Sequence, residues 1–431
     1  MTHIVATGLT LTIFLFHRIE NFQFYWNVPT FMCHQYGIQF EEVSRDFGII
    51  QNPRDEFRGE KIAILYDPGM FPALVHHPDG ALTRRNGGVP QEGDLNRHLE
   101  VFRKHLTEQI TNESFAGVGI IDFESWRPIF RQNWASLDPY RVLSVKLERE
   151  RHPLWSNQAV KKEAVKRFEK WGRIFMDETL KAAKELRPRA TWGYYAYPYC
   201  FNLTPNQPNF ACDRQVVTEN NESAENVLLP SVYLRKSLTD REKIGLINGR
   251  VSEAMRISRR SSPRTKVLPY FWYKEPFVLE VTVNSFREIV DLAADGVIIW
   301  GSSNDLNSSA KCQKFREYLK EILGPAVVEA KQMAKQRARE IAKNIGSVHL
   351  RASRRSIRRY TGPARSFIHR ERSGPWLVAV KGVERPLPIR CEVLPLESVR
   401  GEPRSWDSRT TAVWTEDMHV GEKERGATEE R

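Results

Sequence analysis

The sequence predicts an α/β protein: a distorted (β/α) barrel of the TIM type with about seven parallel strands and a poorly ordered C-terminal tail. Short apolar runs rich in β-branched residues alternate with longer segments of helical period, which is typical of a parallel sheet. The run GVGIIDFESW at 117–126 stops abruptly at two carboxylates, and active sites of such barrels lie at C-terminal strand tips. The alternation ends near residue 330, which fits one barrel with a missing or irregular unit.

Strands and helices are expected in alternation along the chain. Strands are predicted at 22–29, 61–67, 117–126, 192–197, 227–234, 266–273 and 296–301, and helices at 94–110, 156–187, 241–259, 285–294 and 309–323. In the first helix, for example, Leu95, Leu99, Phe102 and Leu106 fall on one face. An open doubly wound sheet is the alternative, and it is weaker because no Gly-rich phosphate loop follows the first strand.

The chain divides into three parts by composition. Residues 21–330 are expected to form the barrel domain. Two interpretations fit residues 1–20: a signal peptide whose apolar segment is 4–16, or a truncated or mispredicted start, since no Lys or Arg precedes that segment. After Pro325 the period weakens. Residues 330–343 fit a continuing helix, but the basic, Ser-rich and Pro-rich sequence of 331–431 is expected to be disordered or weakly ordered.

The charge of the chain is concentrated in this tail. The formal net charge is +12, and between Lys331 and Arg372 thirteen Lys and Arg residues stand against two Glu. The barrel domain is therefore close to neutral, and a nucleic-acid partner is not expected. The tail is interpreted as a solvated segment, with electrostatic attraction to a polyanionic substrate as the alternative.

Cysteines and sequons favour a secreted protein. The five cysteines include no CxxC pair, so a zinc ribbon or a thioredoxin motif is not expected. Two disulfides and one unpaired thiol, with Cys391 in the tail, fit an oxidising compartment. N-x-S/T sequons that allow glycosylation occur at Asn112, Asn202, Asn221 and Asn307. No later segment is apolar and long enough to span a membrane.

The two carboxylates of the third strand are the main candidates for chemistry. Side chains alternate along a strand, so Asp122 and Glu124 face one way and Phe123 the other. A solvent-facing pair, or one paired with Arg127 or Arg131, is the competing interpretation. No HExxH, GxSxG, Walker or calcium-loop motif is present, and His76-His77 precedes a Pro-Asp-Gly turn, so no metal site is expected.

Polar and aromatic residues end the other strands. In a closed barrel these tips converge on one pocket, and rings with polar edges around two acids are typical of a sugar-binding cleft. These residues are Asp67, Tyr195, Tyr197, Tyr233, Tyr270, Tyr273 and Trp300.

The spacing of the carboxylates favours a particular glycosidase mechanism. Two protein acids that flank a scissile bond lie on opposite sides of it, whereas residues i and i+2 of one strand come from the same side. We therefore expect the substrate-assisted variant, in which an acetamido oxygen of the sugar is the nucleophile. One carboxylate then acts as acid and base, and the other orients the acetamido group. Burial and the neighbouring charge should keep the acid protonated.

The sequence also resembles the hyaluronidases of glycoside hydrolase family 56, most closely the arthropod venom and salivary enzymes. The matching motifs occur in order between residues 22 and 330, and the sequence after Lys331 matches no part of the family. They are FYWNVPTFMCHQYG at 24–37, AILYDPGMFPAL at 63–74, GVGIIDFESWRPIFRQNWAS at 117–136, WGYYAYPYC at 192–200, LLPSVYL at 228–234 and IIWGSS at 298–303. The segment 274–285 departs from the family pattern.

The resemblance implies a distorted barrel and endo-hydrolysis of β-1,4 bonds after N-acetylglucosamine in hyaluronan. It implies Glu124 as proton donor, Asp122 as the residue that positions the acetamido group, and Tyr195 beside that group. The implied substrate-binding residues are Tyr233, Trp300, Arg250, Tyr66, Asp67 and Ser303. The implied disulfides are Cys33–Cys312 and Cys200–Cys212.

We therefore predict a secreted, monomeric hyaluronan hydrolase with no metal, no organic cofactor and no membrane partner. Two alternatives remain open at this point. One is a catalytically silent, lectin-like glycan-binding protein that uses the same cleft. The other is a hydrolase that prefers chondroitin.

Overall fold

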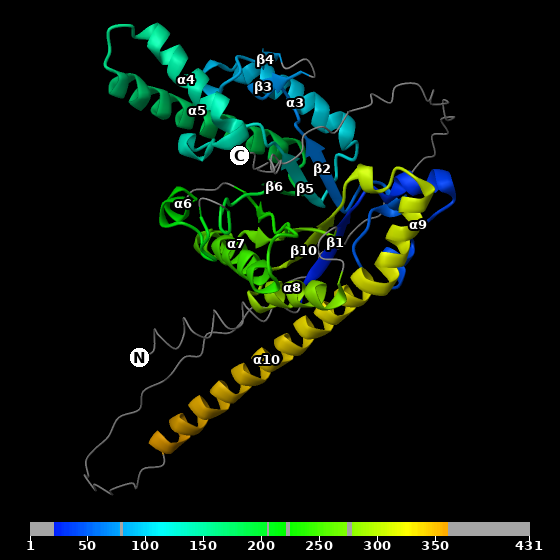
Figure 1. Ribbon diagram of the computed structural model, residues 1–431. Coiled ribbons are helices and arrows are strands. Elements are labelled where there is room, and N and C mark those ends of the chain that lie inside the picture. The colour runs from blue at the N-terminus through cyan, green and yellow to red at the C-terminus, as the bar shows by residue number, and fades with distance from the viewer. Residues whose placement is uncertain (1–20, 78–80, 205–206, 221–224, 274–277, 361–431) are drawn as a thin grey trace, which may run out of the picture. The chain divides into compact units, whose positions relative to one another are not determined.

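The computed structural model describes residues 21–77, 81–204, 207–220, 225–273 and 278–360 (Figure 1). Strands and helices alternate along this part of the chain. The strands are β1 (Gln23–Asn27), β2 (Ile62–Tyr66), β3 (Ala73–His76), β4 (Leu82–Arg85), β5 (Val118–Asp122), β6 (Thr191–Tyr194), β7 (Val227–Leu228), β8 (Lys266–Val267), β9 (Tyr270–Trp272) and β10 (Gly296–Trp300). The helices are α2 (Glu42–Arg45), α3 (Leu95–Gln109), α4 (Asp138–Arg151), α5 (Asn157–Leu186), α6 (Arg214–Glu219), α7 (Asp240–Arg260), α8 (Leu279–Asp291), α9 (Ser309–Tyr318) and α10 (Gly324–Tyr360).

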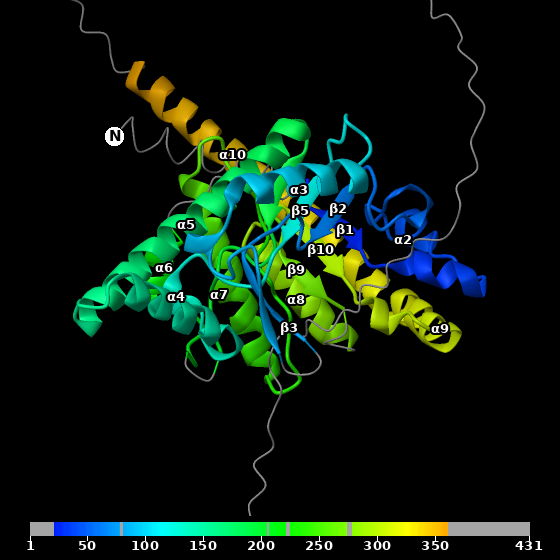
Figure 2. The same ribbon diagram turned by 90° about the horizontal axis from the view of Figure 1, so that it is seen from above.

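The strands at the centre of the fold are parallel, as predicted. One sheet has the order β1-β10-β9, a second has the order β2-β5-β6, and β7 pairs with β8. Single parallel bridges continue these sheets: Ile50 lies beside β1, Tyr195 pairs with Leu229, and Ser231 pairs with Tyr270. Seen from above, helices surround the strands (Figure 2).

Side chains complete the hydrogen bonding at the edge of β2. Asn52 Oδ1 accepts from the backbone N–H groups of Lys61 and Ile62 at 2.8 and 3.1 Å, and its Nδ2 donates to the Ile62 carbonyl at 2.9 Å. Arg58 Nε donates to the Ile64 carbonyl at 2.7 Å. Buried backbone groups that lack a ladder partner need such substitutes.

Alternation along β5 separates two layers of the core. Val118 and Ile120 belong to the small central cluster that the strands enclose. Ile121 and Phe123 belong to the cluster between the strands and the helices α3 and α5. Asp122 therefore continues the inward-facing series, and Phe123 points the other way, as the strand period predicted.

The helices begin where their caps predict. Ser156 caps α5 by accepting from the Ala159 N–H at 3.2 Å. Thr239 and Glu242 form a capping box at the start of α7. In α5 the buried stripe recurs at helical spacing, and it packs against the sheet and against α3 and α4.

The structure corrects several expected strands. The segment 227–234 is a strand only at Val227–Leu228, and 266–273 is divided into β8 and β9. Pro230 and Pro269 lie in these segments, and proline has no N–H to donate to a ladder. In addition, β3 and β4 form an antiparallel hairpin that was not predicted, with Ala73 opposite Arg85.

The helices also differ from prediction at three places. The helix α4 was missed because Ser144 and Glu148 occupy its buried stripe and weaken the apolar period. The helix α8 begins before residue 285, since buried Thr282 and Ser285 satisfy their hydroxyls on carbonyls four residues earlier. The helix α10 includes residues 330–343, where a continuing helix was expected, and extends beyond them to Tyr360.

Both expected disulfides are present. Cys33–Cys312 joins the segment after β1 to α9, and Cys200–Cys212 closes a short loop after β6. Residues 1–20, Asn221 and residues 361–431, which include Cys391, lie outside the described residues. Among the helices of the described chain, no span meets the length and hydropathy that crossing a membrane requires.

Candidate active site

The site is centred on the C-terminal end of β5. Asp122 is the last residue of this strand and lies opposite Tyr66, the last residue of β2. The next residue after β2, Asp67, donates its backbone N–H to the Asp122 carbonyl at 2.7 Å. Glu124 follows two positions after Asp122, on the same side of the chain. Two strand ends therefore bring three carboxylates together.

Asp122 lies in surroundings that disfavour its charge. Burial, followed by the negative charges of Glu124 and Asp67, raises the pKa of Asp122 well above its usual range. Within the described residues its Oδ1 atom is buried and has no hydrogen-bond partner. A buried carboxylate oxygen without a partner is costly, so this atom is suited to receive a donor from a ligand.

Glu124 differs from Asp122 in its access to water. The residue is exposed, with protein atoms packed around its carboxyl group. This burial raises the pKa of Glu124, and the positive charge of Arg127 opposes the increase. Two interacting carboxyls of raised pKa retain a proton at a pH at which isolated carboxyls have lost it.

Aromatic rings form a wall beside the carboxylates. Tyr195 lies 5.9 Å from Tyr233 and 5.1 Å from Tyr270 between ring centroids, and its hydroxyl donates to Ser231 Oγ at 3.2 Å. The charges of Glu124 and Asp122 both contribute to the raised pKa of Tyr195, after burial.

The wall continues from Tyr233 to β2. The Tyr233 ring stacks on Trp300 at 5.6 Å, and Trp272 contacts both rings. Trp300 Nε1 then donates to the Tyr66 hydroxyl at 3.0 Å. The structure thus brings Tyr66, Asp122, Tyr195, Tyr233 and Trp300 into one connected group, although they come from strands far apart in the sequence.

Arg127 is a site residue whose place the sequence did not reveal. Its guanidinium lies over the rings of Phe201, Trp134 and Tyr199, at 4.9, 5.5 and 5.7 Å from their centroids. In the sequence, Arg127 stands out only as a salt-bridge partner of the carboxylates in the non-catalytic interpretation. Its position in the motif D-F-E-S-W-R, a few residues after the end of β5 at Asp122, was the available signal.

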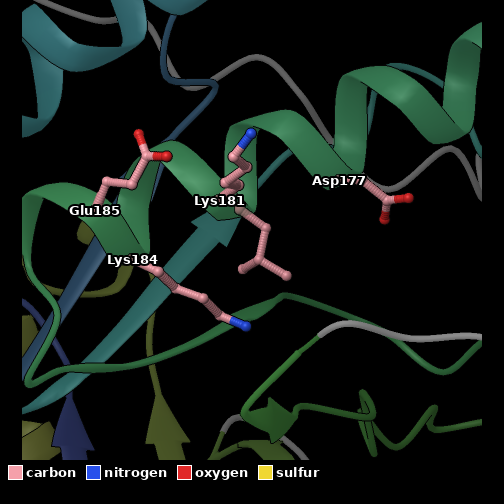
Figure 3. Close-up of a pocket in the computed structure, with 5 residues that line it drawn as sticks. Asp177, Lys181, Lys184 and Glu185 are labelled. Atoms are coloured by element: carbon pink, nitrogen blue, oxygen red, sulfur yellow. The ribbon is translucent and has the colours of Figure 1, made fainter.

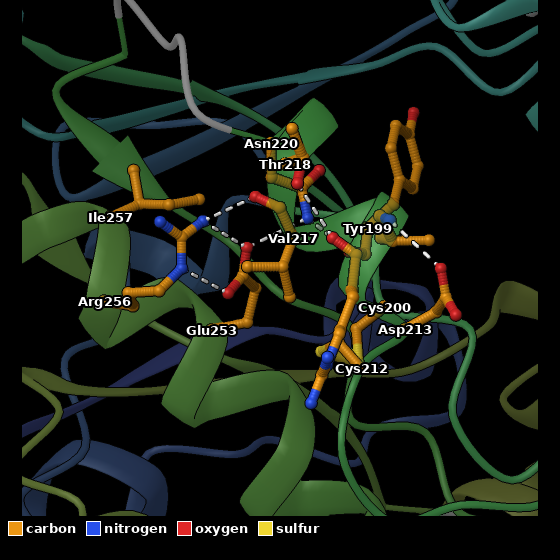
Figure 4. A network of polar contacts seen from close by, with 12 residues as sticks. Tyr199, Cys200, Cys212, Asp213, Val217, Thr218, Asn220, Glu253, Arg256 and Ile257 are labelled. Atoms are coloured by element: carbon orange, nitrogen blue, oxygen red, sulfur yellow. Dashed lines mark hydrogen bonds and ion pairs between the residues drawn. A yellow bond between two sulfur atoms is a disulfide. The ribbon is translucent and has the colours of Figure 1, made fainter.

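A buried polar network fixes the loop that carries Tyr199 (Figure 4). Asn220 Nδ2 donates to the Tyr199 carbonyl at 2.6 Å and to Glu253 Oε1 at 3.2 Å. Glu253 is paired with Arg256 at 2.7 Å, and Arg256 Nη2 donates to the Val217 carbonyl at 3.0 Å. The network joins α6 and α7 to the segment that follows β6.

Two predicted substrate-binding residues lie at the periphery of this group. Arg250 is on α7, where it donates to the Ser231 carbonyl at 2.8 Å and to Asn202 Oδ1 at 3.0 Å. It is thus connected to Tyr195 through Ser231. Ser303 begins a short 3-10 turn after β10 and is half-buried.

The asparagines of the predicted glycosylation sequons differ in their exposure to solvent. Asn112 and Asn307 are exposed. Asn202 is fully buried, and its Nδ2 donates to the carbonyl of Phe210 at 2.7 Å. Asn202 is therefore a structural residue, and its prediction as a glycosylation site is wrong.

A separate cavity of about 280 Å³ lies along α5 (Figure 3). Asp177, Leu180, Lys181, Lys184 and Glu185 line it, all from this one helix. No lining residue belongs to the carboxylate site. In the part of the chain that the structure describes, no group of His, Cys, Asp and Glu has an arrangement that suits a metal ion.

Comparison with known proteins identifies the family of the chain. The sequence matches the family model of the hyaluronidases, glycoside hydrolase family 56, over residues 15–382. The match continues beyond Lys331, so the expectation that the later sequence matches no part of the family is wrong up to residue 382.

Individual relatives are insect proteins. A hyaluronidase of Apis mellifera is 60% identical over 321 residues, which cover 72% of this chain and 84% of the relative. The crystal structure of bee venom hyaluronidase in complex with a hyaluronic acid tetramer has a TM-score of 0.71 and 60% identity, and it covers 72% of this chain and 99% of that chain. A Vespula vulgaris relative called inactive hyaluronidase B is 43% identical over 328 residues, covering 74% of this chain and 96% of the relative. The chain therefore belongs to the hyaluronidase family, glycoside hydrolase family 56.

Proposed function

We propose that the protein hydrolyses internal β-1,4 bonds between N-acetylglucosamine and glucuronate in hyaluronan, by a retaining, substrate-assisted mechanism. The observation that carries the proposal is the pair at the end of β5. Asp122 has a buried oxygen without a partner within the described residues, and Glu124 is a carboxyl of raised pKa that reaches water. Family membership supports hyaluronan as the substrate.

In the first step Glu124 gives its proton to the glycosidic oxygen. The acetamido oxygen of the bound N-acetylglucosamine attacks C1 as the bond from C1 to the leaving oxygen breaks, and a cyclic oxazolinium ion forms. Asp122 accepts a hydrogen bond from the acetamido N–H and stabilises the developing positive charge. That bond favours the ionised form of Asp122, so the proton of the pair is assigned to Glu124 when substrate is bound.

In the second step a water molecule attacks C1 from the face that the leaving group has vacated. Glu124 accepts a proton from this water, and the C1–oxygen bond of the oxazolinium breaks to regenerate the acetamido group. Two inversions at C1 retain the β configuration. The reaction uses one carboxylate as acid and then base, which agrees with two acids on one strand.

The remaining residues bind and orient the sugar. Tyr195 lies beside both acids and is assigned to the acetamido group. Tyr233 and Trp300 are assigned as the apolar wall against which the sugar packs. Tyr66, Asp67 and Ser303 are assigned as polar contacts at the rim. Arg250 is assigned to a glucuronate carboxylate.

The alternative is a silent glycan-binding protein with the same cleft. A relative at 43% identity is called inactive, so family membership alone does not decide the question. The raised pKa of both carboxyls favours catalysis, since a lectin has no need to keep a proton on an acid. A preference for chondroitin would be decided by comparing rates on the two polymers.

We further propose the architecture and location that accompany this activity. The bridges from β1 through Ile50 and from β6 to β9 support closure of the parallel strands into a distorted barrel of seven strands. Two disulfides and the bee venom relative support secretion. Exposed Asn112 and Asn307 are the proposed glycosylation sites within the described chain.

The test is hyaluronan depolymerisation, measured by release of reducing ends as a function of pH. The wild-type rate should fall on the alkaline side only at a pH above the ordinary pKa of a glutamate, because the acid must be protonated and its pKa is raised. Glu124→Gln should lower kcat by about 10²–10⁴-fold. Near-normal activity of this variant would disprove the assignment of the acid, and binding of hyaluronan by the wild type without turnover would support the lectin.

A further inference from the structure

Asp67 is held in one orientation by an arginine from the unexpected hairpin. Arg85 is the last residue of β4, and its two terminal nitrogens contact the two Asp67 carboxylate oxygens, with Nη2 at 2.8 Å from Oδ1. The third nitrogen, Nε, donates to the Phe71 carbonyl at 2.9 Å. A guanidinium that engages one carboxylate with two nitrogens fixes both its position and its rotation.

The backbone of Asp67 is also constrained. Its φ angle is +41°, in the left-handed region that non-glycine residues rarely adopt. From this conformation its N–H donates to the Asp122 carbonyl at 2.7 Å. Strained backbone next to a reactive carboxylate is typical of functional sites, because the surrounding structure has to maintain it.

Other side chains hold the rest of this loop. His105 Nδ1 accepts from the Gly69 N–H and His98 Nδ1 accepts from the Met70 N–H, each at 3.0 Å. Asn86 Nδ2 donates to the Met70 carbonyl at 2.6 Å. Burial, followed by the positive charge of Arg85, lowers the pKa of His98 to about 3, so its ring stays neutral and remains an acceptor. The loop therefore holds Asp67 rigidly against β5.

We propose that Arg85 is a positioning residue for the reaction: it holds the Asp67 carboxylate beside Asp122 and offsets its charge, so that three acids are tolerated at one sheet edge. The role rests on the proposed function. Arg85 acts through Asp67, whose charge acts on Asp122. Without the guanidinium, the Asp67 charge would be uncompensated and its carboxylate free to rotate.

The other groups around these acids come from several elements. Glu124 follows β5, Tyr195 follows β6 and Tyr270 belongs to β9, and the charge of Asp122 acts on both tyrosines. The charges of Arg85 and Asp67 both act on the pKa of Tyr140 in α4. All of these groups are the same in the Arg85 and Asp67 variants. Differences in pH profile between the variants therefore come from the ion pair.

The experiment is a double-mutant cycle read as the pH profile of kcat/KM on hyaluronan. Arg85→Gln should move both limbs to higher pH by about 0.5–1 unit, because the Asp67 carboxylate, no longer held by the guanidinium, can turn its negative charge toward Asp122 and raise the pKa of the acid pair. Asp67→Asn should move both limbs to lower pH. Adding Arg85→Gln to Asp67→Asn should produce no further shift, since Arg85 acts through Asp67. Arg85→Lys should restore part of the wild-type profile.

Arg84→Gln is the matched control. It removes the same charge from the adjacent, exposed position of β4, and its profile should equal that of the wild type. Two outcomes would overturn the role of Arg85 while leaving the proposed function intact, provided that the wild type turns over hyaluronan. One is an unchanged pH profile in Arg85→Gln, and the other is additive shifts in the double variant. If Arg85→Gln fails to fold, an unchanged profile in Asp67→Asn overturns it. Absence of turnover by the wild type would overturn the proposed function and this role together.

Discussion

Buried acids occur in two kinds of surroundings in this protein. On α4, the Glu148 side chain is fully buried and is paired with Arg167 at 2.6 Å and with Arg151 at 3.1 Å. On α7, Glu253 is paired with Arg256. Asp122 at the end of β5 is also withdrawn from water, but its strongest charged neighbours are two other acids.

The acids that stabilise the fold differ from the acid proposed to act in catalysis by the charge of their neighbours. An arginine partner offsets the cost of burying a carboxylate, so Glu148 and Glu253 can hold helices and loops in place without a ligand. Glu148 also has a buried oxygen, Oε2, without a hydrogen-bond partner in the described chain, so the difference lies in the neighbouring charges: those that act on Asp122 are negative, at a position where a ligand is proposed to bind. Arg85 pairs with Asp67, whereas the charges that act most strongly on Asp122 are those of two acids.

The largest effect is expected at the unpaired acid. Asp122→Asn keeps the shape of the side chain but removes the charge proposed to stabilise the oxazolinium ion, so kcat should fall by about 10²–10³-fold. Thermal unfolding should show an unchanged or higher Tm, because a neutral amide replaces a carboxyl whose ionised form is disfavoured by its surroundings. Steady-state kinetics and calorimetry will check kcat and Tm. A lower Tm with a normal kcat would mean that Asp122 stabilises the fold and does not take part in the reaction.

The paired acid should show the opposite behaviour. Glu148→Gln leaves Arg151 and Arg167 without their buried partner, and the free energy of unfolding should fall by about 2–4 kcal/mol. Activity per folded molecule should be unchanged. Denaturant unfolding with active-site titration is the measurement. A large loss of kcat in the folded variant would mean that α4 takes part in the chemistry.

A smaller effect is expected in the ring wall. Trp300→Phe retains the stack on Tyr233 but removes the bond to the Tyr66 hydroxyl, which contributes about 1 kcal/mol. KM for hyaluronan oligosaccharides should rise about 3–10-fold while kcat changes little, as measured by initial rates. An equal fall in kcat would place Trp300 with the acids rather than with the binding wall.

Much of this arrangement was predictable from local sequence. The β-branched run before Asp122 predicted a buried strand, and the period of two placed Asp122 and Glu124 on one side and Phe123 on the other. Aromatic strand ends at Tyr195 and Trp300 predicted rings close to the acids. These inferences succeeded because each depends only on residues close in the chain.

Other features required the assembled structure. The hairpin that carries Arg85 was not predicted, and Asp67 meets Arg85 only when that hairpin folds back onto β2. The rings around Arg127 come from two loops. Asn202 matched a glycosylation triplet, yet the fold buries it against α7.

The sequence by itself determined the class of fold, the strand that carries the acids and the side of that strand on which they lie. Period and propensity are local properties, so they can be read from one segment. Only the tertiary structure decided which acids are neutralised and which are not. That depends on distances between segments far apart in the chain, and on the burial that makes those charges matter.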